Sequence, residues 1–301
     1  MESPFSGRKS GKEWIAMDIK RQHRLYQWKD GKKLELGEKS LVMGILNVTP
    51  DSFSDGGRWN SDTLAVSHTT DMIREGAAII DVGAESTRPG STALTAEEET
   101  KRLMAFLPDV LKLSMVPVSI DSYHYETMEK ALSAGAHMVN DVWGFQYDDG
   151  SMAKVAASFD VPVILMHNQE TEEYSSDIIE DLKHFFDRSL EIALSAGVKA
   201  DNIILDPGIG FSKTGEQNMK ILSRLDELTT AYPCPWFLGV SRKRFIGTIL
   251  GTDASERDEG TAAVNLWGAE KGCTIFRVHD VKTTARELKV WDALRLFGRK
   301  S

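Results

Sequence analysis

The sequence predicts an α/β protein of the (β/α)8-barrel class, the TIM barrel, because short apolar runs alternate with helix-patterned segments along most of the chain. Eight apolar runs have the length of buried parallel strands: 41–48, 77–82, 116–121, 137–142, 161–167, 202–206, 236–241 and 273–279. The segments between and after them have helical patterns: 62–75, 97–113, 123–134, 150–158, 177–196, 215–230, 243–271 with a break near Gly251, and 281–297. A doubly wound open sheet is the alternative, but no strand candidate is followed by a glycine-rich dinucleotide turn.

Glycines at the ends of several predicted helices support these boundaries. Gly76, Gly135 and Gly197 each follow a helical segment directly and precede the next strand candidate, as helix C-cap residues do.

The chain before the first barrel strand has two parts. Residues 24–36 contain two short alternating runs joined by Asp30-Gly31, a favoured turn pair, and predict a β-hairpin that would plug the bottom of the barrel. Residues 1–20 are polar and aperiodic, so we expect a disordered extension and a single barrel domain over residues 21–301.

The composition is that of a soluble globular protein, with 41% apolar and 27% charged residues among 301. The net charge of −9 gives no indication of a nucleic-acid or anionic-membrane partner. No apolar segment approaches the ~18 residues of a membrane span, and the start has no secretory-signal pattern. We therefore expect a cytoplasmic protein in which Cys234 and Cys273, both within apolar runs, are buried thiols.

Polar side chains stand at the C-terminal end of every strand candidate. They are Asn47, Asp81 and Glu85, Asp121, Asn140 and Asp141, His167 and Asn168, Asp206, Ser241 and Lys243, and Arg277 and His279. One such residue is usually a turn or helix cap. In a barrel, however, all eight ends converge on the face where active sites are built, so the repetition predicts an active site there.

One group of these side chains is rich in hydrogen-bond acceptors. Asp121, Asn140 and Asp206 would suit a ligand with several N–H donors, such as a 2-amino-4-oxo pyrimidine edge, which one carboxylate can bind through two parallel hydrogen bonds. The alternative is a hard cation such as Mg²⁺ or Ca²⁺, although the three residues lack the compact spacing of a dedicated metal site.

A second group is basic and follows the last two strands. It contains Arg242-Lys243-Arg244 together with Arg277 and His279, in the region where barrels often bind phosphate. Asn47, on the strand that closes the barrel beside this region, adds an amide that could ligate a phosphate-bound Mg²⁺. The alternative for residues 242–244 is a solvated charge run.

Three loops have unusual compositions. The first strand runs into the polar loop 47–57 (NVTPDSFSDGG), where Phe53 is the one aromatic residue. The loops 83–90 (GAESTRPG) and 206–211 (DPGIGF) combine turn residues with a charged and an aromatic side chain, respectively. We interpret all three as functional loops rather than simple connectors.

With these residues the sequence resembles the dihydropteroate synthase family over roughly residues 40–295. The resemblance rests on NVTPDSFSDGG at 47–57, ESTRPG at 85–90, Asp121-Ser122, Asn140-Asp141, DPGIGF at 206–211, SRK at 241–243 and Arg277-Val278-His279. The family implies a pterin-binding barrel that joins 6-hydroxymethyl-7,8-dihydropterin diphosphate to p-aminobenzoate, with release of pyrophosphate, in folate synthesis. Members are sulfonamide targets and commonly homodimers.

The resemblance also implies roles for individual residues. Pterin would be held by Asp121, Asn140, Met166, Asp206, Lys243 and Arg277, and the diphosphate by Asn47, Arg277 and His279, with Mg²⁺ bound through Asn47. The p-aminobenzoate would be enclosed by Phe53, Thr87, Pro89, Phe211 and Lys243 when the first two loops close over it. Asp55, Arg88 and Lys243 would be the catalytic residues of a substitution in which pyrophosphate leaves early.

Two positions depart from the family pattern: Arg244 stands where many relatives have Ser at the p-aminobenzoate carboxylate, and Ala84 where Gly is common. Three other functions stay open. They are a methyltetrahydrofolate-binding methyl-transfer domain, an aldolase with Lys243 as Schiff-base residue, and a pterin-binding protein without catalytic activity.

Overall fold

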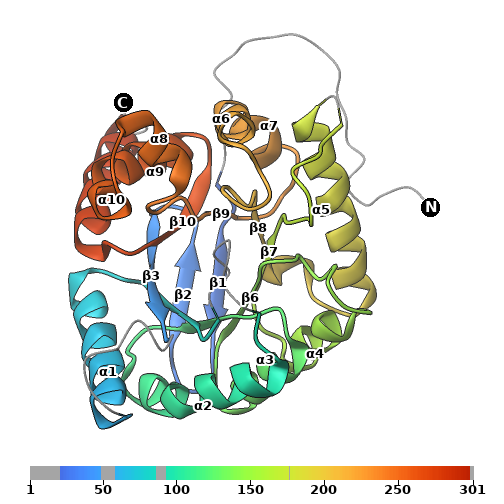
Figure 1. Ribbon diagram of the computed structural model, residues 1–301, viewed down its shortest axis with the longest axis vertical. Coiled ribbons are helices and arrows are strands. Elements are labelled where there is room, and N and C mark those ends of the chain that lie inside the picture. The colour runs from blue at the N-terminus through green and yellow to red at the C-terminus, as the bar shows by residue number, and fades with distance from the viewer. Residues whose placement is uncertain (1–20, 49–57, 86–92, 176, 299–301) are drawn as a thin grey trace.

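The structure is a computed structural model that describes residues 21–48, 58–85, 93–175 and 177–298, without the side chains of residues 58–63. The expected extension 1–20 lies outside these ranges. Eight parallel strands close into a barrel in the order β10-β3-β4-β5-β6-β7-β8-β9, and helices surround them (Figure 1). The predicted (β/α)8 barrel is therefore confirmed.

The barrel strands coincide with the eight apolar runs. They are β3 (Leu41–Asn47), β4 (Ile79–Gly83), β5 (Val118–Asp121), β6 (Met138–Asp141), β7 (Val163–Met166), β8 (Ile203–Asp206), β9 (Trp236–Leu238) and β10 (Cys273–Val278). Two runs enter the ladder late because Pro117 and Pro162 have no N–H to donate; their carbonyls instead accept from Ile80 and Val139 at 3.1 and 3.0 Å.

The helices follow the strands as predicted. They are α1 (Arg58–Glu75), α2 (Ala96–Leu113), α3 (Tyr125–Ser133), α4 (Ser151–Phe159), α5 (Ile178–Ser195), α6 (Gly215–Ser223), α7 (Leu225–Thr229), α8 (Arg244–Leu250), α9 (Asp258–Glu270) and α10 (Val281–Gly298). The break at Gly251 is confirmed, and Gly76, Gly135 and Gly197 adopt positive φ after their helices. None of these helices combines the length and hydropathy of a membrane span.

Several predicted boundaries shift by a few residues, and two of the differences have a clear local cause. The segment 215–230 divides into α6 and α7 at Arg224, whose φ of −111° and ψ of 20° leave the helical region. Strand β9 ends at Leu238 rather than at 241, because the chain turns there and the N–H of Lys243 donates to the carbonyl of Val240 at 3.1 Å.

The hairpin closes the bottom of the barrel, as the sequence predicts. Its strands β1 (Arg24–Gln27) and β2 (Lys33–Leu36) pair antiparallel. Three hairpin side chains pack with the residues that enter the barrel from below: Tyr26, Leu34 and Leu36 against Met43, Ile79, Met138, Ile164, Ile204, Phe237 and Ile275. A second and larger core lies between the strands and the surrounding helices, and it contains both buried cysteine thiols. Among the described residues, the barrel is thus filled from below, which leaves its C-terminal face for ligands.

Candidate active site

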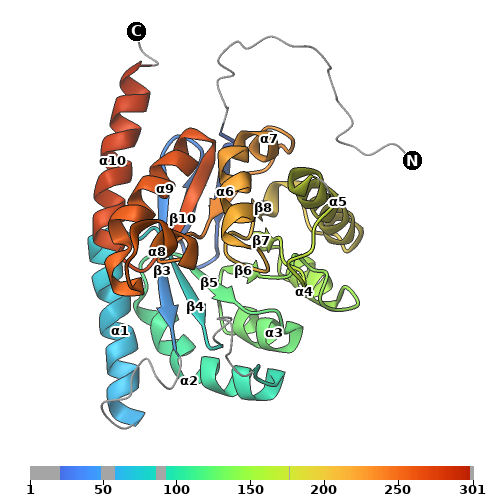
Figure 2. The same ribbon diagram turned by 45° about the horizontal axis from the view of Figure 1, so that its top comes forward.

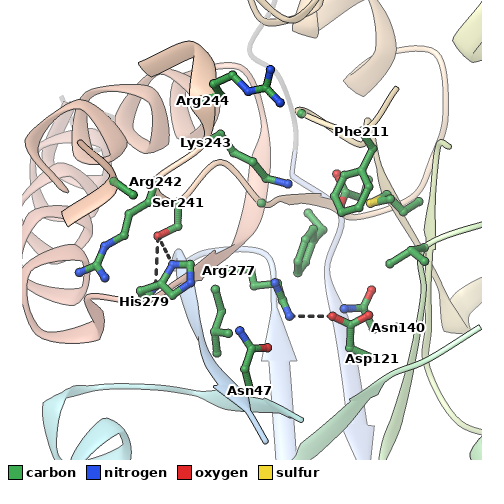
Figure 3. Close-up of a pocket in the computed structure, with 18 of the residues that line it drawn as sticks. Asn47, Asp121, Asn140, Phe211, Ser241, Arg242, Lys243, Arg244, Arg277 and His279 are labelled. Atoms are coloured by element: carbon green, nitrogen blue, oxygen red, sulfur yellow. Dashed lines mark hydrogen bonds and ion pairs between the residues drawn. The ribbon is translucent and has the colours of Figure 1, made fainter. Parts of the chain in front are cut away.

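A cavity of about 480 Å³ opens at the C-terminal ends of the barrel strands. Its lining includes every described residue to which the family resemblance gave a role: Asn47, Asp121, Asn140, Met166, Asp206, Phe211, Lys243, Arg277 and His279. Figure 3 shows Arg277 between the Asp121–Asn140 pair on one side and the Ser241–His279 pair on the other. The acceptor-rich and basic groups therefore face the same cavity.

Arg277 is held between two carboxylates. Its Nε donates to Oδ2 of Asp81 at 2.6 Å, and its Nη2 donates to Oδ2 of Asp121 at 2.7 Å. Asp81 is fully buried one layer below the cavity, where it also accepts a hydrogen bond from Nδ2 of Asn140 at 3.1 Å. This carboxylate therefore joins the basic group to the acceptor group, a role that the sequence analysis did not assign to it.

Asp121 presents one carboxylate oxygen that no described residue uses. Its Oδ1 is buried and has no hydrogen-bond partner among the described residues. Burial raises the pKa of Asp121 to about 7, against the opposing effect of Arg277. A buried acceptor without a donor is costly unless a ligand supplies one, so Asp121 is suited to a ligand N–H group.

Asp206 ends β8 and is likewise buried. Its Oδ1 accepts the N–H of Gly208 at 2.9 Å, but burial dominates and raises its pKa to about 6. Gly208 has a φ of 67°, and a Cβ there would lie 1.9 Å from the carbonyl oxygen of His167. Only glycine fits this turn, which brings the backbone close to β7 and aims the Asp206 carboxylate at the cavity.

A buried lysine holds the loop that carries Phe211. Nζ of Lys213 donates to the carbonyls of Gly208 and Phe211, both at 3.0 Å, and lies 2.9 Å from Nδ1 of His167. Burial lowers the pKa of Lys213 to about 7 despite the nearby Asp206. No local pattern indicates this burial, because Lys213 stands in a polar stretch that is typical of an exposed loop.

Lys243 and Phe211 contact each other across the cavity. Nζ of Lys243 lies 3.9 Å from the centre of the Phe211 ring, within cation–π distance. The backbone of Gly210 lies against the lysine stem, since a Cβ there would be 2.7 Å from its Cδ. Arg244, which is exposed, lines the cavity on the same side. This corner offers an aromatic face and two cations to an aromatic carboxylate.

His279 is oriented by a serine. The Ser241 hydroxyl lies 2.9 Å from Nδ1 of His279 and accepts the backbone N–H of the same residue at 3.1 Å. The hydroxyl engages Nδ1 and thereby fixes the orientation of the imidazole ring. Together with Arg277, the ring gives this part of the cavity donors suited to an anion.

Arg242, the first of the three basic residues that the sequence grouped together, lines the cavity but pairs its guanidinium with an acidic residue. Its Nε and Nη2 form a bidentate pair with Asp258, both at 2.8 Å, and Figure 3 shows its side chain turned away from Arg277 and Asp121. The three consecutive basic residues of the sequence therefore do different work.

The donor set fits a magnesium ion that arrives with a phosphate better than a permanently bound one. No group of three or more acidic, histidine or cysteine side chains that could hold a metal occurs within the described ranges. Asn47 contributes one amide at the cavity edge. Mg²⁺ commonly takes one or two protein oxygens and completes its shell with phosphate oxygens and water, which is the arrangement that Asn47 allows.

The loop predictions are only partly covered by the structure. Phe53, Asp55, Thr87, Arg88 and Pro89 lie outside the described residues. Glu85, which precedes the second loop, does line the cavity; it accepts hydrogen bonds from the Tyr123 hydroxyl at 3.1 Å and the Leu94 N–H at 3.3 Å.

The fold and cavity define a class of protein: a (β/α)8-barrel enzyme whose mouth combines buried acceptors with an anion-binding side. A family model described as pterin binding enzyme matches residues 43–279. The dihydropteroate synthase of Bacillus subtilis is 47% identical over 87% of this chain and 90% of its own length. The dihydropteroate synthase of Clostridium beijerinckii is also 47% identical, over 87% of this chain and 97% of its own length.

Solved structures agree. A dihydropteroate synthase from Clostridium difficile, crystallised in the presence of pteroic acid, superposes with a TM-score of 0.84 at 44% identity, covering 87% of this chain and 98% of that one. A dihydropteroate synthase from Xanthomonas albilineans in complex with 7,8-dihydropteroate superposes with a TM-score of 0.80 at 34% identity. The match covers 88% of this chain and 97% of that one. The chain belongs to the dihydropteroate synthase family, as its sequence motifs predict, and to the transferases of folate biosynthesis.

Proposed function

We propose that the chain joins 6-hydroxymethyl-7,8-dihydropterin diphosphate to p-aminobenzoate, giving 7,8-dihydropteroate and pyrophosphate. The observation that carries the proposal is that one cavity combines the Asp121 and Asp206 carboxylates with a cationic side formed by Arg277 and Lys243, which His279 adjoins. Oδ1 of Asp121 has no hydrogen-bond partner among the described residues. Dihydropterin diphosphate has the matching composition, with N–H donors on its ring and two phosphates at its other end.

In this proposal the pterin ring lies between the acceptors. Asp121 and Asp206 accept from the ring N–H groups and the exocyclic amine, Asn140 meets the polar edge, and Met166 packs against the ring. Asp206 is buried and Asp121 is mostly buried, so their hydrogen bonds to the ligand are shielded from water and stronger than surface ones.

The diphosphate lies on the cationic side. Arg277 and His279 donate to its oxygens and stabilise the negative charge that develops as the C–O bond to pyrophosphate breaks. A magnesium ion held by Asn47 and phosphate oxygens would neutralise further charge on the leaving group. The electron-rich dihydropterin stabilises the cationic methylene that remains, and the p-aminobenzoate nitrogen then forms the new C–N bond and loses a proton.

The second substrate occupies the corner made by Phe211 and Lys243. The aromatic ring of p-aminobenzoate would stack near Phe211, and its carboxylate would face Lys243 and Arg244. We assign Phe53, Thr87 and Pro89 to the same site, with Asp55 and Arg88 stabilising the reacting cation and departing pyrophosphate, on the strength of their motifs alone.

Product formation tests the proposal. The purified chain is incubated with dihydropterin diphosphate, labelled p-aminobenzoate and Mg²⁺, and the product is resolved by chromatography. We expect labelled dihydropteroate to form, and we expect a competing sulfonamide to lower the amount of product. A protein that binds the pterin without forming any product would instead support the non-catalytic alternative.

We also propose a homodimer formed through α10. Along this helix Val290, Leu294 and Phe297 are 62%, 70% and 79% exposed and recur at helical spacing. Figure 2 shows the C-terminal end of α10 standing clear of its neighbours. Leu294→Glu is expected to convert a dimer to a monomer in sedimentation experiments; an unchanged mass would rule out this face.

A cytoplasmic location remains a prediction from the sequence.

A further inference from the structure

Arg242 is a strained residue between two residues of the cavity. Its backbone φ of 58° is in the left-handed region, which residues other than glycine and asparagine rarely adopt. It occupies the third position of the turn closed by the hydrogen bond from Lys243 to Val240, where a positive φ is needed. Arg242 and the residues on either side of it, Ser241 and Lys243, all line the cavity.

The first turn of α9 and the residue before it hold Arg242 by its backbone and its side chain. The Arg242 N–H donates to Oγ1 of Thr261 at 3.1 Å, and its carbonyl accepts from Nη1 of Arg257 at 3.0 Å. Asp258 binds the guanidinium through two hydrogen bonds of 2.8 Å. A strained conformation persists only where its surroundings enforce it, and these four contacts do so.

Arg257 is in turn fixed against α8. Its Nε and Nη2 donate to the carbonyl of Thr252 at 3.2 and 3.0 Å. Its guanidinium lies on the backbone of Gly247, where an added Cβ would be only 2.2 Å from Nε. The absence of a side chain at Gly247 therefore allows Arg257 to reach the Arg242 carbonyl.

The direction of the Arg242 side chain separates two possible roles. A residue that binds an anion would aim its guanidinium into the cavity, as Arg277 does. Arg242 points away from Arg277 and Asp121 (Figure 3) and is already paired with Asp258. Its neighbours point the other way: the Lys243 ammonium reaches Phe211, and the Ser241 hydroxyl reaches His279.

We propose that Arg242 is a positioning residue: Arg257, Asp258 and Thr261 clamp it in a left-handed turn, and this turn aims Lys243 and Ser241 at the substrates. The inference rests on the proposed function, because it takes Lys243 and His279 as substrate contacts. In this proposal the start of α9, more than ten residues further along the chain than the turn, helps to hold the site in shape.

The comparison of Arg242→Gly with Arg242→Ala tests the clamp directly. Both variants lose the ion pair with Asp258, but glycine adopts the left-handed turn without a side-chain clash, whereas alanine does not. We expect Arg242→Ala to raise KM for p-aminobenzoate by about 10-fold and to lower kcat, and Arg242→Gly to stay within about 3-fold of the unsubstituted chain. Equal loss in both, confined to KM for the diphosphate substrate, would show that the side chain binds the anion and overturn the proposal. Unchanged kinetics in both would overturn it as well.

A second pair of variants reaches the clamp without touching Arg242. Gly247→Ala places a methyl group on the Arg257 guanidinium, whereas Gly215→Ala, in α6, adds a methyl with nothing within 4 Å. Gly247→Ala is expected to reproduce the kinetic change of Arg242→Ala, and Gly215→Ala to leave the kinetics unchanged. If Gly247→Ala does not fold, Asp258→Asn takes its place. Normal kinetics in the folded clamp variant would contradict the proposal.

A binding measurement separates failure of the clamp from failure of the proposed function. Calorimetric titration with dihydropterin diphosphate reads the affinity of each variant without turnover. If the unsubstituted chain makes no dihydropteroate, the proposed function fails. The clamp is still tested, because it predicts that Arg242→Gly binds dihydropterin diphosphate more tightly than Arg242→Ala does.

Discussion

The two ends of the barrel are built from the same strands, but they differ in whether their buried polar groups have hydrogen-bond partners. At the bottom, the hairpin residues Tyr26, Leu34 and Leu36 pack into an apolar cluster, and the polar Tyr26 hydroxyl donates to the carbonyl of Asp201 at 2.8 Å. At and just below the mouth, Oδ1 of Asp121 and Oδ1 of Asp81 have no hydrogen-bond partner within the described residues.

This difference separates stability from function within one fold. Apolar burial at the bottom stabilises the barrel, whereas ionised carboxylates at the mouth lose hydration that the protein does not fully replace. Burial raises the pKa of Asp121 to about 7 and of Asp206 to about 6. A raised carboxyl pKa means that the charged form is disfavoured in the folded state, so these groups are retained at a cost in stability.

The largest expected effect is the loss of pterin binding in Asp206→Ala. Each hydrogen bond to a charged group contributes about 1.5–3 kcal/mol, so losing two costs roughly 10²- to 10⁴-fold in affinity. Calorimetric titration with dihydropterin diphosphate measures this change. If Asp206→Ala kept its affinity but became much less stable, Asp206 would belong to the fold rather than to the site.

The matching change at the bottom of the barrel is Leu36→Ala. Leu36 is fully buried, and a Leu-to-Ala change in a core costs about 2–5 kcal/mol in the free energy of unfolding. Urea denaturation measures this loss, and KM for both substrates should stay unchanged. A large rise in KM without a loss of stability would mean that the two ends are not separate in function.

The pH dependence sharpens the comparison further. Because Asp121 and Asp206 titrate near 7 and 6, lowering the pH from 8 to 5 protonates both and removes acceptors from the pterin. KM for the pterin substrate should rise below pH 7, approaching about 10-fold per pH unit for each group once it is mostly protonated. Steady-state kinetics across this range test it, and Asp121→Asn should remove the upper transition. A flat profile would mean that neither carboxylate binds the pterin in its charged form.

The sequence was enough to predict the architecture because its signals are local. Apolar runs, helix-ending glycines and the Asp30-Gly31 turn each depend on neighbouring residues, and the closed barrel follows from their order. The convergence of Asn47, Asp121 and Arg277 on one cavity followed from the fold once the strands were placed.

The features that sequence reasoning missed depend on distant partners. Asp81 gains its role from Arg277, which is 196 residues further along the chain. Lys213 is buried only because His167 and the loop carbonyls enclose it. Arg242 resembles its basic neighbours in sequence, and its contacts with Arg257, Asp258 and Thr261 distinguish it from them.

One measurement tests the central claim, that the charges of the mouth serve the ligand at the expense of the fold. The free energy of unfolding of Asp121→Asn is compared with that of the unsubstituted chain at pH 5 and pH 8, beside the affinity of each for dihydropterin diphosphate. With its pKa raised from about 3.9 to about 7, Asp121 makes the unsubstituted chain lose stability as the pH rises through this interval.

The account predicts that Asp121→Asn gains relative stability between pH 5 and pH 8, while its pterin affinity at pH 8 falls by roughly 10- to 100-fold. A variant that is strongly destabilised at pH 8 and still binds the pterin normally would contradict it.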